Sequence, residues 1–279
     1  MLELNGHSVV SSEVLSDRDI EQFDETGLLK VKQAFAPETA AEIRSLLWER
    51  FAKWGITRGA PETWQSLDAA TIRNVMKSTR RVRSLPAIYN NHSDAIASQL
   101  TRSNDIEKVK PLLLLTFSGQ HEHIEDEVVP SKIWHLDTPN LVNGAIAGVI
   151  ALGFVNHVRP GGGGTMVVAG SHRFFNASTS AVTSKIAKRK LRKHRYFSEL
   201  FSKGTANRDR FLEQAECVED IEVKVVELTG EPGDVYFVNG SLLHTLTRNY
   251  LDDPRMMIRG FYQSPKLAEY YQDYFRKSS

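Results

Sequence analysis

Cysteine is almost absent from this chain of 279 residues, in which Cys217 is the only one. A single cysteine excludes an internal disulfide and a cysteine-rich zinc site, and it fits a reducing compartment. The first residues carry no cationic start followed by an apolar core, so a signal peptide is not expected. We therefore expect a cytoplasmic protein.

Long apolar runs and an excess of one charge sign are missing as well. The longest apolar stretch, at 144–155, is too short and too often interrupted by glycine to span a bilayer. The 35 basic residues are balanced by 34 acidic residues, which leaves a formal net charge of +1. Such a balance gives no global field that would attract nucleic acid. The expected partner is a small molecule, not a nucleic acid or a membrane.

The length fits one large domain, and no repeat or low-complexity linker divides residues 1–279. Helical signals dominate up to residue 109. Ser16 with Asp19 three residues later is a capping pattern, and Gly27 is a helix stop. Helices are expected at 16–27, 37–55 and 93–103 and a short strand at 28–32, whereas 56–90 is expected to be irregular.

From residue 110 to residue 265 the pattern changes to short apolar or β-branched runs separated by Gly, Pro, Asn or Asp. The expected strands are 110–118, 133–137, 144–155, 165–171, 221–228, 234–240 and 255–263. These runs do not alternate regularly with helices, which argues against a doubly wound parallel sheet. The sequence predicts a mainly β fold, a sandwich or jelly roll with N-terminal helices packed outside.

A basic insertion is expected near 176–210. Its segment "KIAKRKLRKHRYF" at 185–197 concentrates lysine and arginine between two expected strands. One interpretation is a solvated helix. The other is a lid or docking surface for an anionic substrate or partner.

The segment "SKIWHLDTPN" places His135 two residues before Asp137. Side chains at i and i+2 of a strand point to one face, so this pair could hold two corners of a metal site. A jelly roll can bring His244, far along the chain, to the same point. Two imidazoles and one carboxylate on one face of an octahedral metal leave three positions open, an arrangement suited to non-haem Fe(II). Zinc is more often held by a closed tetrahedral set or by three ligands and a water.

Arg255 follows His244 by eleven residues and opens an expected strand. The planar guanidinium of an arginine beside such a metal can bind a carboxylate through two hydrogen bonds. The pattern therefore indicates a metal site with an anchor for a dicarboxylic acid.

Four motifs in this order resemble the phytanoyl-CoA dioxygenase family. They are H-x-D, "GGGGTMVVAGSHR" at 161–173, "PGDVYFVNGSLLH" at 232–244, and an arginine eleven residues after the last histidine. The opening "IEQFDETGLLKVKQAF" at 20–35 is similar too, so the likeness spans nearly the whole chain. Ala169 stands where the family usually has proline, and the basic block is longer and more cationic than the family leads us to expect.

The resemblance implies an oxygenase on a double-stranded β-helix, the jelly-roll or cupin-like fold, that uses Fe(II), 2-oxoglutarate and O₂. It implies that His135, Asp137 and His244 ligate the iron and that Arg255 holds the distal carboxylate of 2-oxoglutarate. Thr165 matches a small polar position near this co-substrate. Because Asp137 keeps the carboxylate that related halogenases lack, the expected reaction is hydroxylation of an unactivated C–H, or a related desaturation or ring formation, in a role such as natural-product biosynthesis.

Two other functions remain open: a non-catalytic metal-binding jelly-roll protein, and a zinc-dependent cupin-type hydrolase. Other polar residues have simpler interpretations. His172 is expected to form structural hydrogen bonds, and His121 and His123 are expected in an exposed loop. Arg259 follows Arg255 at four residues, a spacing that does not favour a nucleic-acid substrate.

Overall fold

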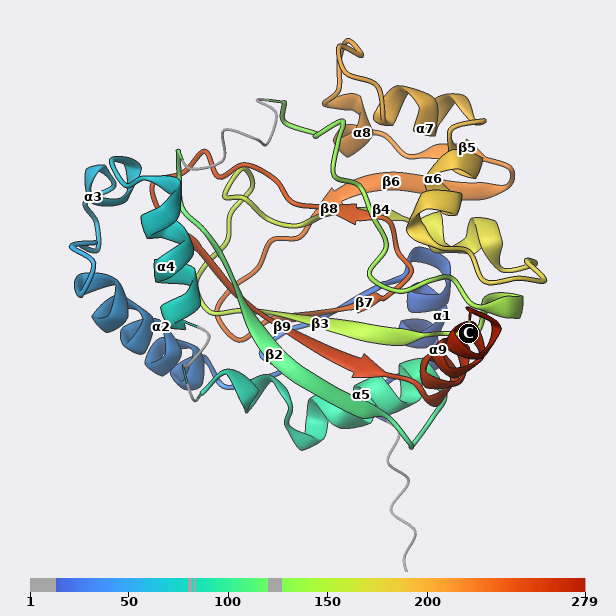
Figure 1. Ribbon diagram of the computed structural model, residues 1–279, viewed down its shortest axis with the longest axis horizontal. Coiled ribbons are helices and arrows are strands. Elements are labelled where there is room, and N and C mark those ends of the chain that lie inside the picture. The colour runs from blue at the N-terminus through green and yellow to red at the C-terminus, as the bar shows by residue number, and fades with distance from the viewer. Residues whose placement is uncertain (1–13, 80–81, 83, 120–126, 279) are drawn as a thin grey trace, which may run out of the picture.

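The computed structural model describes residues 14–79, 82, 84–119 and 127–278, and these contain two antiparallel sheets (Figure 1). The strands are β1 Leu28–Val31, β2 Glu107–Thr116, β3 Gly148–Phe154, β4 Met166–Ala169, β5 Glu216–Val218, β6 Ile221–Glu227, β7 Val235–Asn239, β8 His244–Thr245 and β9 Arg255–Gln263. The larger sheet has the order β1-β7-β3-β9-β2, and the smaller sheet has the order β5-β6-β4-β8. The two sheets pack as the predicted jelly roll, a double-stranded β-helix.

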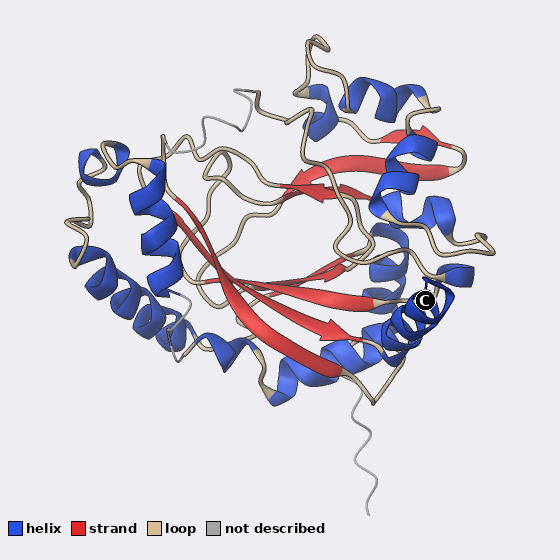
Figure 2. Ribbon diagram, in the orientation of Figure 1, coloured by secondary structure: helices blue, strands red, loops and turns tan. Residues whose placement is uncertain are grey.

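The helices lie outside the two sheets (Figure 2). They are α1 Asp17–Thr26, α2 Pro37–Ala52, α3 Glu62–Gln65, α4 Ala69–Thr79, α5 Asn91–Thr101, α6 Ser184–Leu191, α7 Arg195–Leu200, α8 Arg210–Glu213 and α9 Pro265–Ser278. Helix α1 begins at the predicted capping box of Ser16 and Asp19, and it ends at Gly27 with a φ of 76°. Within the described ranges, no helix combines the length and the apolar character needed to cross a membrane.

The pleat of β3 explains why its sequence is apolar throughout. Val149 and Ala151 point outward and join the hydrophobic cluster that α2 and α5 build against the larger sheet. Ile150 and Leu152 point inward and join the cluster between the two sheets. Because both faces of β3 are covered, its residues show no polar alternation.

The basic insertion packs against the outer face of the smaller sheet. Ala187 and Leu191 of α6 are buried in one cluster with Phe197 of α7 and with Val223 and Val225 of β6. The basic side chains lie on the faces of α6 that do not contact this cluster. Helix α6 is therefore an amphipathic helix that packs on the fold through its apolar face.

Several local predictions were wrong. Residues 133–137 form no strand: Ile133 has a φ of 63°, and His135 makes only an isolated bridge to His244. The strand expected from residue 144 starts at Gly148, because Val142–Gly144 forms a short 3-10 turn. Residues 56–90 contain α3 and α4, where no helix was expected.

Candidate metal centre

The structure brings His135, Asp137 and His244 together, although residues 133–137 are not a strand. One ligand atom from each residue lies within 4.8 Å of the others. Asp137 Oδ1 is 3.6 Å from the Nε2 atom of each histidine. The histidines are locked together by the backbone, since each N–H donates to the other's carbonyl at 2.9 and 3.0 Å. No second group of histidine, cysteine and acidic residues with metal-ligand spacing occurs in the described part of the chain.

Backbone carbonyls set the tautomer of both histidines. Nδ1 of His135 lies 2.8 Å from the carbonyl of Ile133, and Nδ1 of His244 lies 2.9 Å from the carbonyl of Leu242. A carbonyl only accepts hydrogen bonds, so each Nδ1 carries the hydrogen and each Nε2 keeps its lone pair. The left-handed backbone of Ile133, which is unfavourable for a β-branched residue, places its carbonyl for this contact. Both lone pairs are therefore available to a metal.

Arg259 orients the carboxylate. Its Nε and Nη2 donate to Asp137 Oδ2 at 3.2 and 2.6 Å, which leaves Oδ1 facing the two imidazoles. This contact with Asp137 was not predicted from the sequence. The signal was present, because Arg255 and Arg259 are four residues apart in one strand and so share a face.

The protonation states suit a metal ligand set. Burial would raise the pKa of the Asp137 carboxyl, but its contacts with His244 and Arg259 hold that pKa well below the ordinary value. Burial, the His244 imidazole and the Lys188 ammonium together lower the pKa of His135. At neutral pH the carboxyl is therefore ionised and the His135 imidazole is neutral, the forms that bind metal.

A cavity of about 240 Å³ opens beside the three residues, between the two sheets. Most of its lining is apolar, and its polar side chains include the two histidines and the aspartate. The lining residues are Leu114, His135, Asp137, Ile150, Leu152, Thr165, Val167, Val238, His244, Leu246 and Arg259. A small, largely apolar cavity with a few convergent polar groups is typical of a small-molecule site.

Arg255 lies buried next to this cavity, with 3% of its surface exposed. Its Nη1 donates to Thr165 Oγ1 at 3.4 Å, and its Nε has no hydrogen-bond partner among the described residues. Burial lowers its pKa to about 10 despite the nearby charge of Glu227, so the guanidinium stays protonated at neutral pH. Glu227 itself accepts hydrogen bonds from the N–H groups of Gly161 and Gly164. A buried cation with an unused donor fits a carboxylate ligand.

The other sequence candidates lie elsewhere. Nε2 of His172 is 3.1 Å from the carbonyl of Asp24, which agrees with the expected structural role. The glycine run forms a turn that holds Glu227, as described above. His121 and His123 lie outside the described residues.

No protein-family model matches the sequence, and no curated protein matches it. Solved structures do match. AviO1 from Streptomyces viridochromogenes Tue57 is 17% identical with a TM-score of 0.51, over 89% of this chain and 94% of that chain. EctD from S. alaskensis with bound Fe is 16% identical with a TM-score of 0.51, over 90% of this chain and 77% of that chain.

EvdO2 from Micromonospora carbonacea var. aurantiaca is 13% identical with a TM-score of 0.50, over 90% of this chain and 91% of that chain. Structural similarity at this level of sequence identity shows a shared fold. Of these three solved structures, that of EctD contains bound Fe. The double-stranded β-helix expected from the sequence is therefore confirmed as the fold of this chain.

Proposed function

We propose that residues 1–279 form a single oxygenase domain that depends on Fe(II) and 2-oxoglutarate and hydroxylates an unactivated C–H of a small molecule. One observation carries this proposal. Three ligand atoms converge at one end of an apolar cavity, and the buried guanidinium of Arg255 has an unused donor beside the same cavity. The fold shared with EctD, whose solved structure contains bound Fe, supports the choice of iron.

The Nε2 atoms of His135 and His244 and Oδ1 of Asp137 would hold the iron. Fe(II) at this position would supply the activation of O₂, with 2-oxoglutarate as the source of electrons. Arg259 would keep Asp137 bound to the metal through one oxygen, because it occupies the other.

Arg255 and Thr165 would bind the distal carboxylate of 2-oxoglutarate. The guanidinium is charged, buried and already directed by its contact with the threonine hydroxyl. The apolar walls of the cavity, among them Ile150, Leu152 and Val238, would exclude water from the reaction. Asp137 favours hydroxylation over halogenation, because its carboxylate fills the position that a halide would need.

The direct test is turnover of 2-oxoglutarate to succinate in the presence of Fe(II) and O₂. We expect Asp137→Ala to lose bound iron and all succinate formation while keeping the wild-type circular dichroism spectrum. Asp253→Ala is a matched control, since the Asp253 side chain is 76% exposed on the surface, and it should behave as wild type. An Asp137→Ala protein that retains iron and turnover would refute the metal assignment. Activity with Zn(II) and without O₂ would point to the hydrolase alternative.

A further inference from the structure

A second cavity, of about 320 Å³, lies where the basic insertion meets the segment that leads into the metal centre. It is lined by Ser131, Lys132, Ile133, Trp134, Lys188, Arg192, Phe201 and Lys203. We call it the cationic groove, after its four basic residues Lys132, Lys188, Arg192 and Lys203. Among the described residues no aspartate or glutamate lines it. The groove is therefore a strongly positive site within a protein of nearly balanced charge.

Helix α6 turns one of its faces toward the segment that carries His135 and Asp137. Ser184, Lys188 and Arg192 follow one another at four-residue spacing and so share one face of the helix. The hydroxyl of Ser184 accepts a hydrogen bond from the backbone N–H of Leu136, which lies between His135 and Asp137. Lys188, one turn further on, is close enough to His135 for its charge to act on the imidazole.

The groove cations differ from two other arginines of the insertion. Arg195 and Arg210 both pair with Glu199. In contrast, Lys188, Arg192 and Lys203 form no ion pair within the described part of the chain. Like charges around one cavity repel each other, and the repulsion is relieved when an anion binds between them. The guanidinium of Arg192 also stacks over the ring of Phe201, with 5.7 Å between Cζ and the ring centroid, which limits its freedom.

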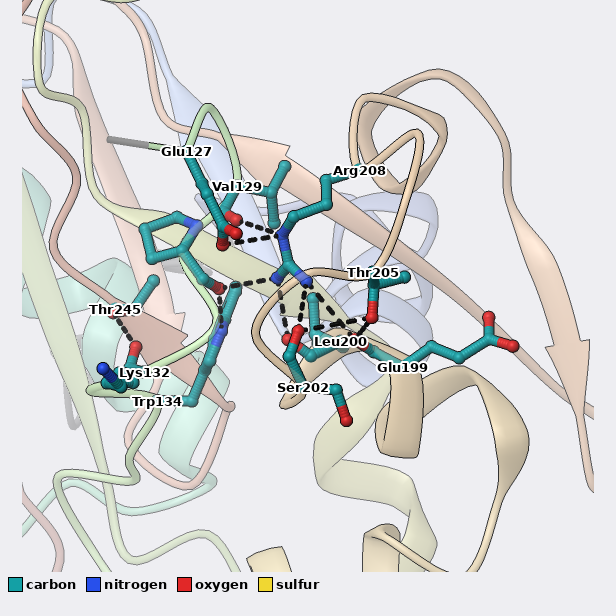
Figure 3. A network of polar contacts seen from close by, with 11 residues as sticks. Glu127, Val129, Lys132, Trp134, Glu199, Leu200, Ser202, Thr205, Arg208 and Thr245 are labelled. Carbon is teal, nitrogen blue, oxygen red and sulfur yellow. Dashed lines mark hydrogen bonds and ion pairs between the residues drawn. The ribbon is translucent and has the colours of Figure 1, made fainter. Parts of the chain in front are cut away.

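The two walls of the groove are joined by a buried arginine (Figure 3). Nε of Arg208 donates to the carbonyl of Val129 at 2.6 Å, and Nη2 donates to the carbonyls of Pro130 and Leu200 at 3.1 and 2.8 Å. Nη1 donates to the carbonyl of Ser202 at 2.9 Å. One side chain thus ties the segment before the metal centre to the end of α7. The groove is a preformed site between two connected walls.

We propose, building on the oxygenase function, that the substrate carries a phosphate or diphosphate group and that this group binds in the cationic groove. The guanidinium fork of Arg192 and the ammonium groups of Lys188 and Lys203 match the geometry and charge of phosphate oxygens. Several cations around one cavity fit an anion of charge −2 or more better than a single carboxylate. The remainder of the substrate would reach the apolar cavity past His135.

Inorganic pyrophosphate is the probe, titrated into the full-length protein by calorimetry at low and at physiological ionic strength. We expect saturable binding that weakens as salt rises, because salt screens exposed charges. The double variant Lys188→Ser/Arg192→Ser should lose at least about tenfold in affinity, the equivalent of one charge-assisted hydrogen bond. Lys185→Ser/Arg189→Ser removes the same charge from two exposed positions of α6 outside the groove and should bind as wild type.

Equal affinities of the two double variants, or no saturable binding to the wild type, would overturn the proposal. A separate measurement of 2-oxoglutarate binding in the presence of Mn(II) distinguishes this failure from failure of the oxygenase function. Both double variants should bind 2-oxoglutarate as the wild type does, because Arg255 and the three metal-binding candidates are unchanged. If pyrophosphate binds in the groove but 2-oxoglutarate does not bind at all, the groove remains and the oxygenase function is refuted.

Discussion

Two peptide carbonyls, those of Ile133 and Leu242, determine which nitrogen of each candidate metal-binding histidine is available. Each carbonyl lies two residues before its histidine, so the local backbone alone fixes the tautomer. Arg259 performs the corresponding task for Asp137 from a distant strand. Such supporting contacts keep ligands in the orientation and protonation state that a metal requires.

Arg255 is the residue for which a conservative substitution is most informative. Arg255→Lys keeps the charge but removes the planar fork, so it cannot make two parallel hydrogen bonds to a carboxylate. We expect the KM for 2-oxoglutarate to rise roughly ten- to a hundredfold, the loss of one charge-assisted hydrogen bond. Steady-state kinetics measures this directly. Arg159→Lys, at a half-exposed surface position, is the control, and an unchanged KM in Arg255→Lys would move the co-substrate role to another arginine.

At the residue scale the sequence predicted the candidate ligands but not their support. Spacing and resemblance predict His135, Asp137 and His244, because both depend only on the order of residues in the sequence. The contact between Arg259 and Asp137 depends on how strand β9 lies relative to the loop that carries Asp137. Within the sheet, Arg259 is paired with Leu112 of β2 and Leu152 of β3. That alignment is a property of the folded sheet, which spacing alone does not determine.

At the scale of elements, strong local signals were the reliable ones. The capping box at Ser16 and the stop at Gly27 define α1 as predicted. Helix α4 was missed because its buried face is small: only Val75 and Thr79 are buried, and the apolar Met76 is exposed. The expected strand at 133–137 was wrong because alternation of apolar and polar residues does not reveal a left-handed residue such as Ile133.

Arg208 allows a test of how the insertion is attached. Arg208→Met removes the donors to several buried carbonyls and leaves Glu127 without the ion pair that it forms at 3.2 Å. Breaking a buried charge network costs about 3–5 kcal/mol, so we expect Tm to fall by on the order of 10 °C. Urea unfolding and calorimetry measure the loss.

A matched control for this variant lies two residues away. Arg210 pairs with Glu199, and 26% of the Arg210 side chain is exposed. Partly exposed ion pairs contribute about 0–1 kcal/mol, so Arg210→Met should lower Tm only slightly. A similar loss in both variants would mean that Arg208 is no more important than a surface ion pair.

At the scale of the whole molecule, the core and the cavity share residues. Ile150, Leu152, Val167 and Val238 belong to the hydrophobic cluster between the sheets and also line the cavity. The outward faces of the same strands are covered by helices. A ligand that fills the cavity therefore contacts the centre of the fold, and its binding should be visible as added stability.

We expect Mn(II), a redox-stable substitute for Fe(II), and 2-oxoglutarate to raise Tm together. At ligand concentrations about one hundred times Kd, linkage adds about 2.7 kcal/mol, which corresponds to roughly 5–10 °C for a chain of this size. Differential scanning fluorimetry measures the shift. His244→Ala should show no shift with the same additions, and an equal shift in that variant would place the binding site elsewhere.

The backbone bridge between His135 and His244 also bears on the rates of folding and unfolding. It joins two segments that are far apart in the chain, and contacts of this kind carry the entropic cost of closing a long loop, which delays their formation. We expect the metal-binding arrangement to be completed late in folding, after the rate-limiting barrier. A bound metal would slow the unfolding reaction and leave the refolding rate unchanged, because interactions absent from the transition state act on unfolding alone. In the cell, iron would lengthen the lifetime of the folded chain without helping it to fold.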